Sequence, residues 1–283
     1  MAAQEANMPF IKHLASSDRK TRTSALASLR TFLSAPATAA RLTPLDHRKL
    51  WKGLYYSLWM CDRPLPQQTL CADLAALVHV FGGAAPALRF LQAFWETMAR
   101  EWTSIDVLRM EKFLLLVRRV LGACLGWALE GDDGQGGKGK KGKGKKGRGK
   151  REEGEGEGEG EGRIEPMLRL LSSWPFEATG DLSKVPVGLR LHCLDIWVDE
   201  VERLGLLEAE ASEEGKTFLD RIRALVDVQT KSTCKPVRAR AKESLADERL
   251  PGNGGGSSDE DGDEEMVEDA AGGAKDSWDG FED

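Results

Sequence analysis

The feature that most limits how this chain can fold is a low-complexity stretch near its middle. Residues 131–162 consist almost only of Gly, Lys and Glu, so they offer very little apolar surface. Burial of apolar surface is what offsets the entropy lost when a chain becomes ordered. We therefore expect a disordered insert here, which separates an N-terminal helical part, 1–130, from a second helical part, 163–247.

Charge is distributed unevenly along the chain. Residues 1–130 hold 16 Lys and Arg against 10 Asp and Glu, whereas residues 248–283 hold 2 against 13. The last segment is also rich in Gly and Ser, so we expect a disordered acidic C-terminal tail. A basic N-terminal half beside an acidic tail indicates a chain that works near polyanions or basic partners.

Helical periodicity dominates the sequence outside these two segments, and strand-like alternation is nearly absent. Thr43, Pro44 and Asp46 form a typical capped helix start, and Thr103 with Asp106 repeats the capping pattern before a long helix. Helices are expected near 8–15, 18–34, 43–60, 66–81, 86–101, 106–129, 164–172, 186–205, 212–230 and 235–247. Short connections between them predict stacked antiparallel pairs.

The predicted fold class is all-α, an irregular HEAT-like helical-repeat (α-solenoid) domain. One segment favours the HEAT type, because Leu14, Asp18, Arg22, Ala25 and Leu29 follow the order of residues in the second helix of such a repeat. No clean repeat period is visible along the chain. We expect the second helical part to pack on the first.

Residues able to catalyse a reaction or hold a metal are scattered. The four histidines, His13, His47, His79 and His192, lie far apart without a second ligand at metal spacing. No GxxxxGK[ST] loop or GxSxG motif is present. The five cysteines form no CxxC pair, which favours reduced core residues of an intracellular protein. We expect no enzyme activity, cofactor or metal.

The most apolar stretch, Phe113–Leu129, contains Arg118 and Arg119 within 17 residues. A membrane span needs about 20 apolar residues and tolerates a central Arg poorly. We therefore expect a buried helix and no membrane association.

A dense basic block begins at Lys138 and reads KGKKGKGKKGRGKR. We interpret it as a nuclear or nucleolar address, or as a flexible arm that binds phosphates. The alternative is a solvated loop that keeps the chain soluble, and the acidic repeat that follows could pair with it. The candidate address residues are Lys138, Lys140, Lys141, Lys143, Lys145, Lys146, Arg148, Lys150 and Arg151.

Cations within the predicted helices are candidates for contact with RNA or an acidic partner. They are Lys49, Lys52, Arg63, Arg100, Arg109, Lys112 and Arg119. Arg109, Lys112 and Arg119 are expected on one face of the long helix, although an ordinary solvated face would show the same pattern. Trp51, Tyr55 and Trp59 recur at helical spacing, which favours the core over stacking on RNA bases.

The acidic tail carries two kinds of candidate site. Ser257 and Ser258 each precede an acidic residue by three positions, a pattern that predicts phosphorylation by acidophilic kinases. Trp278 and Phe281 are candidate anchors of a short docking motif. The alternative for the whole segment is a solubilising tail.

Three stretches together resemble the ribosomal RNA processing protein 1 family of nucleolar proteins. They are KLWKGLYYSLWMCDRPLPQQ at 49–68, FWETMAREWTSIDVLRMEKFLLLVRRVL at 94–121 and VPVGLRLHCLDIWVDEVERLG at 185–205. The opening FIKHLASSDRKTRTSALASLRTFLSA fits as well. The resemblance covers about residues 8–230 apart from the insert. That insert and a short C-terminus depart from the family pattern, in which many members have long basic tails.

The resemblance implies a helical-repeat domain, a nucleolar location, and a non-enzymatic scaffold role in processing precursor rRNA toward the large ribosomal subunit. It also implies partners among other large-subunit assembly factors, including a β-propeller protein and a Brix-type RNA-binding protein. Direct contact with precursor rRNA stays open. The alternative function is a nuclear helical-repeat adaptor that binds chromatin or transcription factors.

Overall fold

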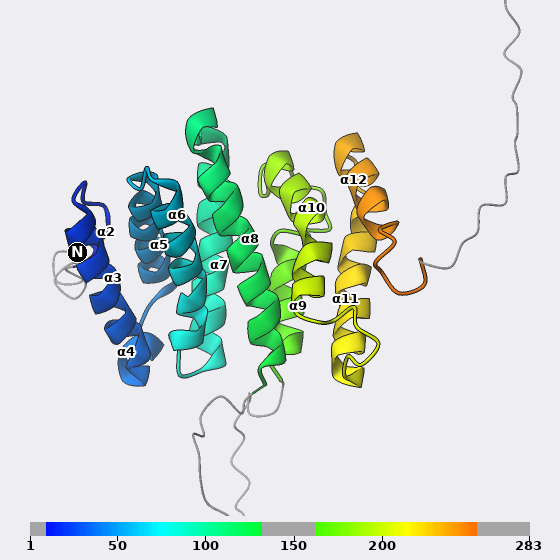
Figure 1. The fold of residues 1–283 in the computed structure, drawn as a ribbon, viewed down its shortest axis with the longest axis horizontal. Coiled ribbons are helices and arrows are strands. Elements are labelled where there is room, and N and C mark those ends of the chain that lie inside the picture. The colour runs from blue at the N-terminus through cyan, green and yellow to red at the C-terminus, as the bar shows by residue number, and fades with distance from the viewer. Residues whose placement is uncertain (1–9, 132–161, 254–283) are drawn as a thin grey trace, which may run out of the picture.

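A computed structural model describes residues 10–131 and 162–253 of the chain (Figure 1). This part contains α2 (Phe10–Leu14), α3 (Arg19–Ser34), α4 (Pro36–Ala40), α5 (Pro44–Trp59), α6 (Pro64–Ala75), α7 (Ala84–Glu101), α8 (Val107–Leu129), α9 (Ile164–Ser173), α10 (Val187–Arg203), α11 (Glu213–Gln229) and α12 (Lys235–Leu245). Short 3-10 helices follow α6 and α7. The prediction of an all-α fold is confirmed, since none of the described residues forms a strand. Most of the predicted insert and acidic tail lies outside these ranges.

The helices are stacked in two layers (Figure 1). In the first layer α2 packs on α5, α5 on α7, α7 on α9 and α9 on α11. In the second layer α6 packs on α8, α8 on α10 and α10 on α12, and α3 stands before α6 at the start of the row. Each second-layer helix begins at the edge of the molecule where its first-layer partner ends. This is the stacked antiparallel arrangement that the sequence predicts.

Helix starts follow local sequence signals, with two corrections. Thr43 and Asp46 form the predicted capping box at α5, and Asp18 caps α3. At α8, however, Asp106 is itself the N-cap and accepts a hydrogen bond from the Arg109 amide at 3.1 Å. Thr103 lies in a 3-10 turn, so the predicted box is wrong. The short α4 was not predicted from the sequence; Pro36 stands at its start, where the fixed φ of proline suits the first helical turn.

The same contact occurs at both ends of the array, in α3 and in α12, where an arginine of the helix bonds the turn that precedes it. Nη1 of Arg22 donates to the carbonyls of Ser16 and Ser17, each at 2.8 Å. Nη1 of Arg238 likewise donates to the carbonyls five and six residues before it, at 2.9 and 2.7 Å. The two segments are SSDRKTR at 16–22 and STCKPVR at 232–238, and in each the arginine stands at the same distance from the two residues whose carbonyls it contacts. Each arginine therefore satisfies carbonyls of the turn before its own helix, a structural repeat that no sequence period reveals.

The aromatic side chains of α5 and α7 form the centre of the core. Trp51 and Trp95 are almost completely buried, and the indole N–H of Trp51 donates to the Phe90 carbonyl at 2.8 Å. The ring of Tyr55 stacks on Phe113 with centroids 4.6 Å apart. The prediction that Trp51 and Tyr55 belong to the core is confirmed, whereas Trp59 is only partly buried against it.

The contact between α8 and α10 is close because one residue lacks a side chain. Glu200 on α10 is fully buried and accepts hydrogen bonds from Arg118 Nε at 2.9 Å and Arg203 Nη2 at 2.5 Å. A Cβ atom at Gly122 on α8 would lie 2.1 Å from Glu200 Oε2 and 2.2 Å from Arg203 Nη2. Glycine is therefore required at this position for the carboxylate and its two arginines to fit against α8.

We expect Gly122→Ala to destabilise the protein by about 1–3 kcal/mol, the usual cost of forcing an extra methyl group into a packed interface. Gly126→Ala is the matched control, since its Cβ would meet Leu204 at an ordinary 3.4 Å. The control should be neutral or stabilising by up to about 1 kcal/mol, because alanine favours helix. Chemical denaturation measures both variants, and equal effects of the two would contradict this packing.

Candidate interaction surfaces

Three of the predicted contact cations lie on the first layer. Lys49 and Lys52 belong to α5, and Arg100 belongs to the end of α7. Lys52 Nζ and Arg100 Nε both lie 2.8 Å from Oε1 of Glu101. Both side chains are partly exposed. Glu101 therefore neutralises much of the local charge, and Lys49 is the member of this group without an ion pair among the described residues.

Three further predicted cations lie on or beside the second layer. Arg63 is exposed at the N-cap position of α6. Arg109 pairs with Asp106 at 2.5 Å, and its guanidinium carbon lies 4.6 Å from the ring centroid of Trp59. Arg119 is partly buried, and its Nε has no hydrogen-bond partner within 10–131 and 162–253. These three cations do not form one continuous row.

Lys112 lies in the interior, where the sequence analysis did not place it. Its side chain is only 4% exposed, and Nζ donates to the carbonyls of Trp59 at 2.8 Å and Cys61 at 2.9 Å. Burial lowers the pKa of Lys112, which the nearby Asp62 partly opposes. The expectation of one shared exposed face with Arg109 and Arg119 is wrong, because α6 packs on this side of α8. Lys112 is a structural residue that secures the α5–α6 turn.

The candidate address, the two candidate phosphorylation sites, and the aromatic anchors of the tail all lie outside the described residues. They stay predictions from the sequence. The two grooves and the exposed apolar side chains described next are formed by the helices of the array.

A first groove opens between α7 and α9 in the first layer. It has a volume of about 530 Å³. Arg89, Arg169 and Lys184 contribute positive charge to its lining, and Glu96 is the single carboxylate. Lys184 Nζ lies 4.8 Å from the ring centroid of Trp174, which also lines the groove. Sequence reasoning missed this site, because its cations are far apart in the chain and meet only through the packing of α7 against α9.

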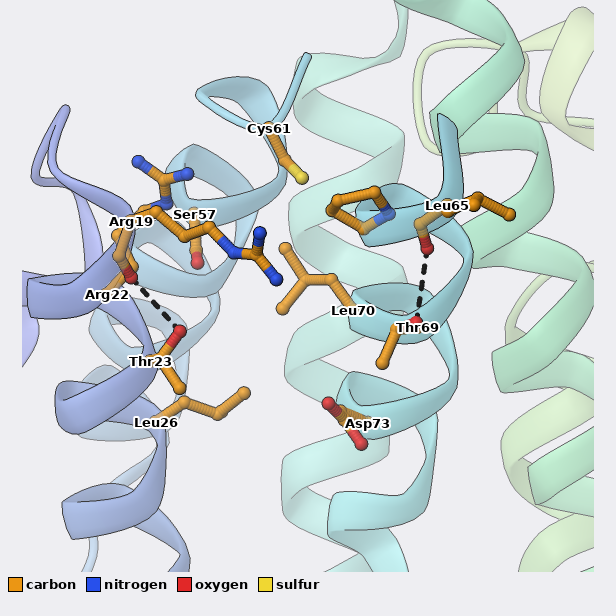
Figure 2. Close-up of a pocket in the computed structure, with 11 residues that line it drawn as sticks. Arg19, Arg22, Thr23, Leu26, Ser57, Cys61, Leu65, Thr69, Leu70 and Asp73 are labelled. Atoms are coloured by element: carbon orange, nitrogen blue, oxygen red, sulfur yellow. Dashed lines mark hydrogen bonds between the residues drawn. The ribbon is translucent and has the colours of Figure 1, made fainter. Parts of the chain in front are cut away.

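A second groove, of about 330 Å³, opens between α3 and α6 in the second layer (Figure 2). Arg19, Arg22 and Leu26 line it from α3, while Leu70 and Asp73 line it from α6. The side chains of Leu26 and Leu70 point into the space between the two helices. The groove was not predicted from the sequence.

Four of the seven large apolar side chains that the described residues expose lie at one edge. Val107 and Leu108 are 88% and 93% exposed in the first turn of α8, and Leu65 is 74% exposed in the first turn of α6. Met60 is also exposed, immediately before the α5–α6 turn. All four lie where first-layer helices end and second-layer helices begin. Exposed apolar clusters of this kind are typical of protein contact sites.

Two of the four histidines have structural surroundings. His47 is fully buried beside Phe81 and Phe90, and burial, with the nearby Arg89, lowers its pKa to about 4. His192 hydrogen-bonds the Leu114 carbonyl at 2.9 Å. Within the described ranges, no three or more His, Cys, Asp or Glu side chains gather in a group that could hold a metal ion. Nor is any helix of this part long and apolar enough to cross a membrane.

The fold and these surfaces define an α-helical repeat protein with one charged and one partly apolar groove. Comparison with known proteins identifies its family. The model of the nucleolar protein Nop52 matches residues 5–279, so the chain belongs to the Nop52 family.

Named relatives agree with this assignment. Ribosomal RNA processing protein 1 homolog A from Homo sapiens is 33% identical over 242 residues, which is 83% of this chain and 42% of the relative. Homolog A from Mus musculus is 34% identical over 217 residues, 74% of this chain and 37% of the relative. The homolog from Drosophila melanogaster is 40% identical over 123 residues, 43% of this chain and 18% of the relative. The family resemblance seen in the sequence is confirmed, and the chain spans less than half the length of these relatives.

Proposed function

We propose that this protein is a non-enzymatic nucleolar scaffold in precursors of the large ribosomal subunit, where it supports processing of precursor rRNA. Family membership carries the proposal, because the matching relatives are named ribosomal RNA processing proteins and the family is nucleolar. The architecture supports it, since a stacked helical array offers long surfaces for binding and little mobile chemistry. Its partners would be other large-subunit assembly factors, including β-propeller and Brix-type proteins.

The groove between α7 and α9 is the best candidate for direct contact with precursor rRNA. Arg89 and Lys184 line it together with Trp174, and Lys49 lies on the neighbouring α5 in the same layer. Cations that meet phosphates release bound counterions, so the resulting affinity falls as salt rises. Base stacking on an aromatic ring adds affinity without demanding a particular sequence. The proposed contact is therefore sequence-tolerant and salt-sensitive.

Sedimentation with precursor particles tests this proposal. We expect the protein to migrate with large-subunit precursors, and the paired changes Lys49→Glu and Lys184→Glu to shift it toward the free fractions. The difference from wild type should shrink as salt rises, since each lost phosphate contact lowers the salt dependence by about one counterion. Lys216→Glu is the matched control, because Lys216 is exposed on α11 and pairs only locally with Glu213. Wild-type protein found only in free fractions at low salt would contradict the proposal.

A further inference from the structure

The second layer has a gap between its first two helices. Each later helix of this layer packs closely on its neighbour, whereas α3 and α6 make almost no direct contact. The gap is the groove of about 330 Å³ shown in Figure 2. A volume of this size lies at the lower end of pockets that hold ligands or anchoring side chains.

The groove has an apolar middle. Leu26 of α3 and Leu70 of α6 approach it from opposite sides and are only partly buried, and Pro66 lines it from the first turn of α6. When an apolar group of a ligand removes the remaining exposed surface of these side chains from water, the burial stabilises the complex. The middle of the groove therefore favours apolar side chains of a ligand.

The α3 side of the groove is positively charged, because Arg19 and Arg22 line it directly. Arg22 is engaged with two carbonyls of the preceding turn, but Arg19 forms no ion pair with the residues that the structure describes. On the opposite helix the lining contains one carboxylate, Asp73, and no cation. The ligand therefore needs acidic groups beside α3.

We propose that the groove between α3 and α6 binds an acidic, amphipathic segment of a partner protein. Apolar side chains of that segment cover Leu26 and Leu70, and its carboxylates face Arg19. Asp73 sets the direction of the segment, because its carboxylate favours a hydrogen-bond donor or cation at that end. Recognition of an amphipathic helix by an apolar groove is a recurring mode of peptide binding.

RNA fits the same groove less well. A nucleic acid would need cations along both walls and aromatic rings for its bases. The α6 wall supplies neither, and the middle of the groove is aliphatic. The inference rests on this geometry and charge, and it stands or falls independently of the proposed function.

Photo-crosslinking from within the groove tests the proposal. A benzophenone side chain replaces Thr69 in the full chain in cells, and each adduct is identified by mass spectrometry. Thr69 is exposed, lines the groove, and bonds only the Leu65 carbonyl four residues earlier. We expect an adduct with one defined protein segment in which apolar residues recur at helical spacing beside Asp and Glu. An RNA adduct, a segment of this same chain, or no adduct would each overturn the proposal.

Position and charge provide the controls. Thr31 on α3 is also exposed and also bonds a carbonyl four residues earlier, but it lies outside the groove. The same segment captured equally from Thr31 would overturn the proposal.

Arg19→Glu should reduce the Thr69 adduct at least about tenfold, a change of about 1.4 kcal/mol in binding. Lys20→Glu should leave it unchanged, because Lys20 is exposed beside Arg19 and does not line the groove. Equal adduct yields from these two variants, at matched thermal stability, would contradict the assigned site.

Discussion

Lys112→Glu is expected to lower the free energy of unfolding by about 3–5 kcal/mol, the usual cost of leaving a buried charge without its partners. The ammonium of Lys112 donates to the carbonyls of Trp59 and Cys61. A carboxylate at this place would face the same two carbonyl oxygens and could donate to neither when ionised. Equilibrium denaturation in urea measures the effect.

Lys49→Glu is the control for Lys112→Glu. Lys49 is partly exposed on α5 and has no ion pair within the described part of the chain. Surface substitutions of this kind usually change stability by less than about 0.5 kcal/mol. If the two variants unfold at the same urea concentration, Lys112 does not have the buried, carbonyl-bonded position that the structure gives it.

Arg190→Met is expected to destabilise the protein by a similar amount, about 3–5 kcal/mol. Arg190 is almost completely buried, and its Nη2 donates to Glu177 Oε2 at 2.8 Å and to the Asp181 carbonyl at 3.0 Å. Its other nitrogens reach the carbonyls of Glu177 and Val185 and the side chain of Gln229. Methionine fills the space but leaves the Glu177 carboxylate without its partner. Urea denaturation of the variant measures this loss.

The pH dependence gives the Arg190 prediction a second readout. Burial raises the pKa of Glu177, but hydrogen bonds from Thr179 and Arg190 outweigh it and bring the pKa to about 2, from an ordinary 4.5. Because the pKa of this carboxyl group is lower in the folded state than in the unfolded state, its ionised form stabilises the fold at pH values above the unfolded-state pKa. This contribution disappears as the pH falls toward 2. The stability difference between wild type and Arg190→Met should therefore be full above about pH 4.5 and shrink in acid.

Arg221→Met is the matched control for the buried pair. Arg221 pairs with Glu165, and both side chains are more than two-fifths exposed. Exposed pairs contribute about 0–1 kcal/mol, so this variant should be close to wild type at every pH. An equally large loss in both variants would contradict the assignment of Arg190 as the centre of a buried network.

Features encoded by neighbouring residues were predictable from the sequence. The capping box of Thr43 and Asp46 lies within four residues, and Trp51 and Tyr55 show their burial through helical spacing. Lys112 shows the limit of that reasoning. A helical face is read from one helix, whereas the burial of Lys112 depends on α6 and on carbonyls more than 50 residues earlier.

The two grooves lay beyond prediction for a related reason. The groove at α3 and α6 exists because these helices diverge while their neighbours pack closely. The groove at α7 and α9 joins residues from both sides of the 131–162 segment. Neither the divergence of two helices nor the meeting of two distant segments leaves a local pattern in the sequence.

The role in large-subunit maturation is best tested by depleting the protein and following precursor rRNA on RNA blots, with the sedimentation of the protein measured in parallel. We expect that large-subunit precursors accumulate, that small-subunit rRNA is largely spared, and that the protein migrates with pre-ribosomal particles before depletion. Normal precursor levels together with free protein would contradict it, and family membership would then describe the fold alone.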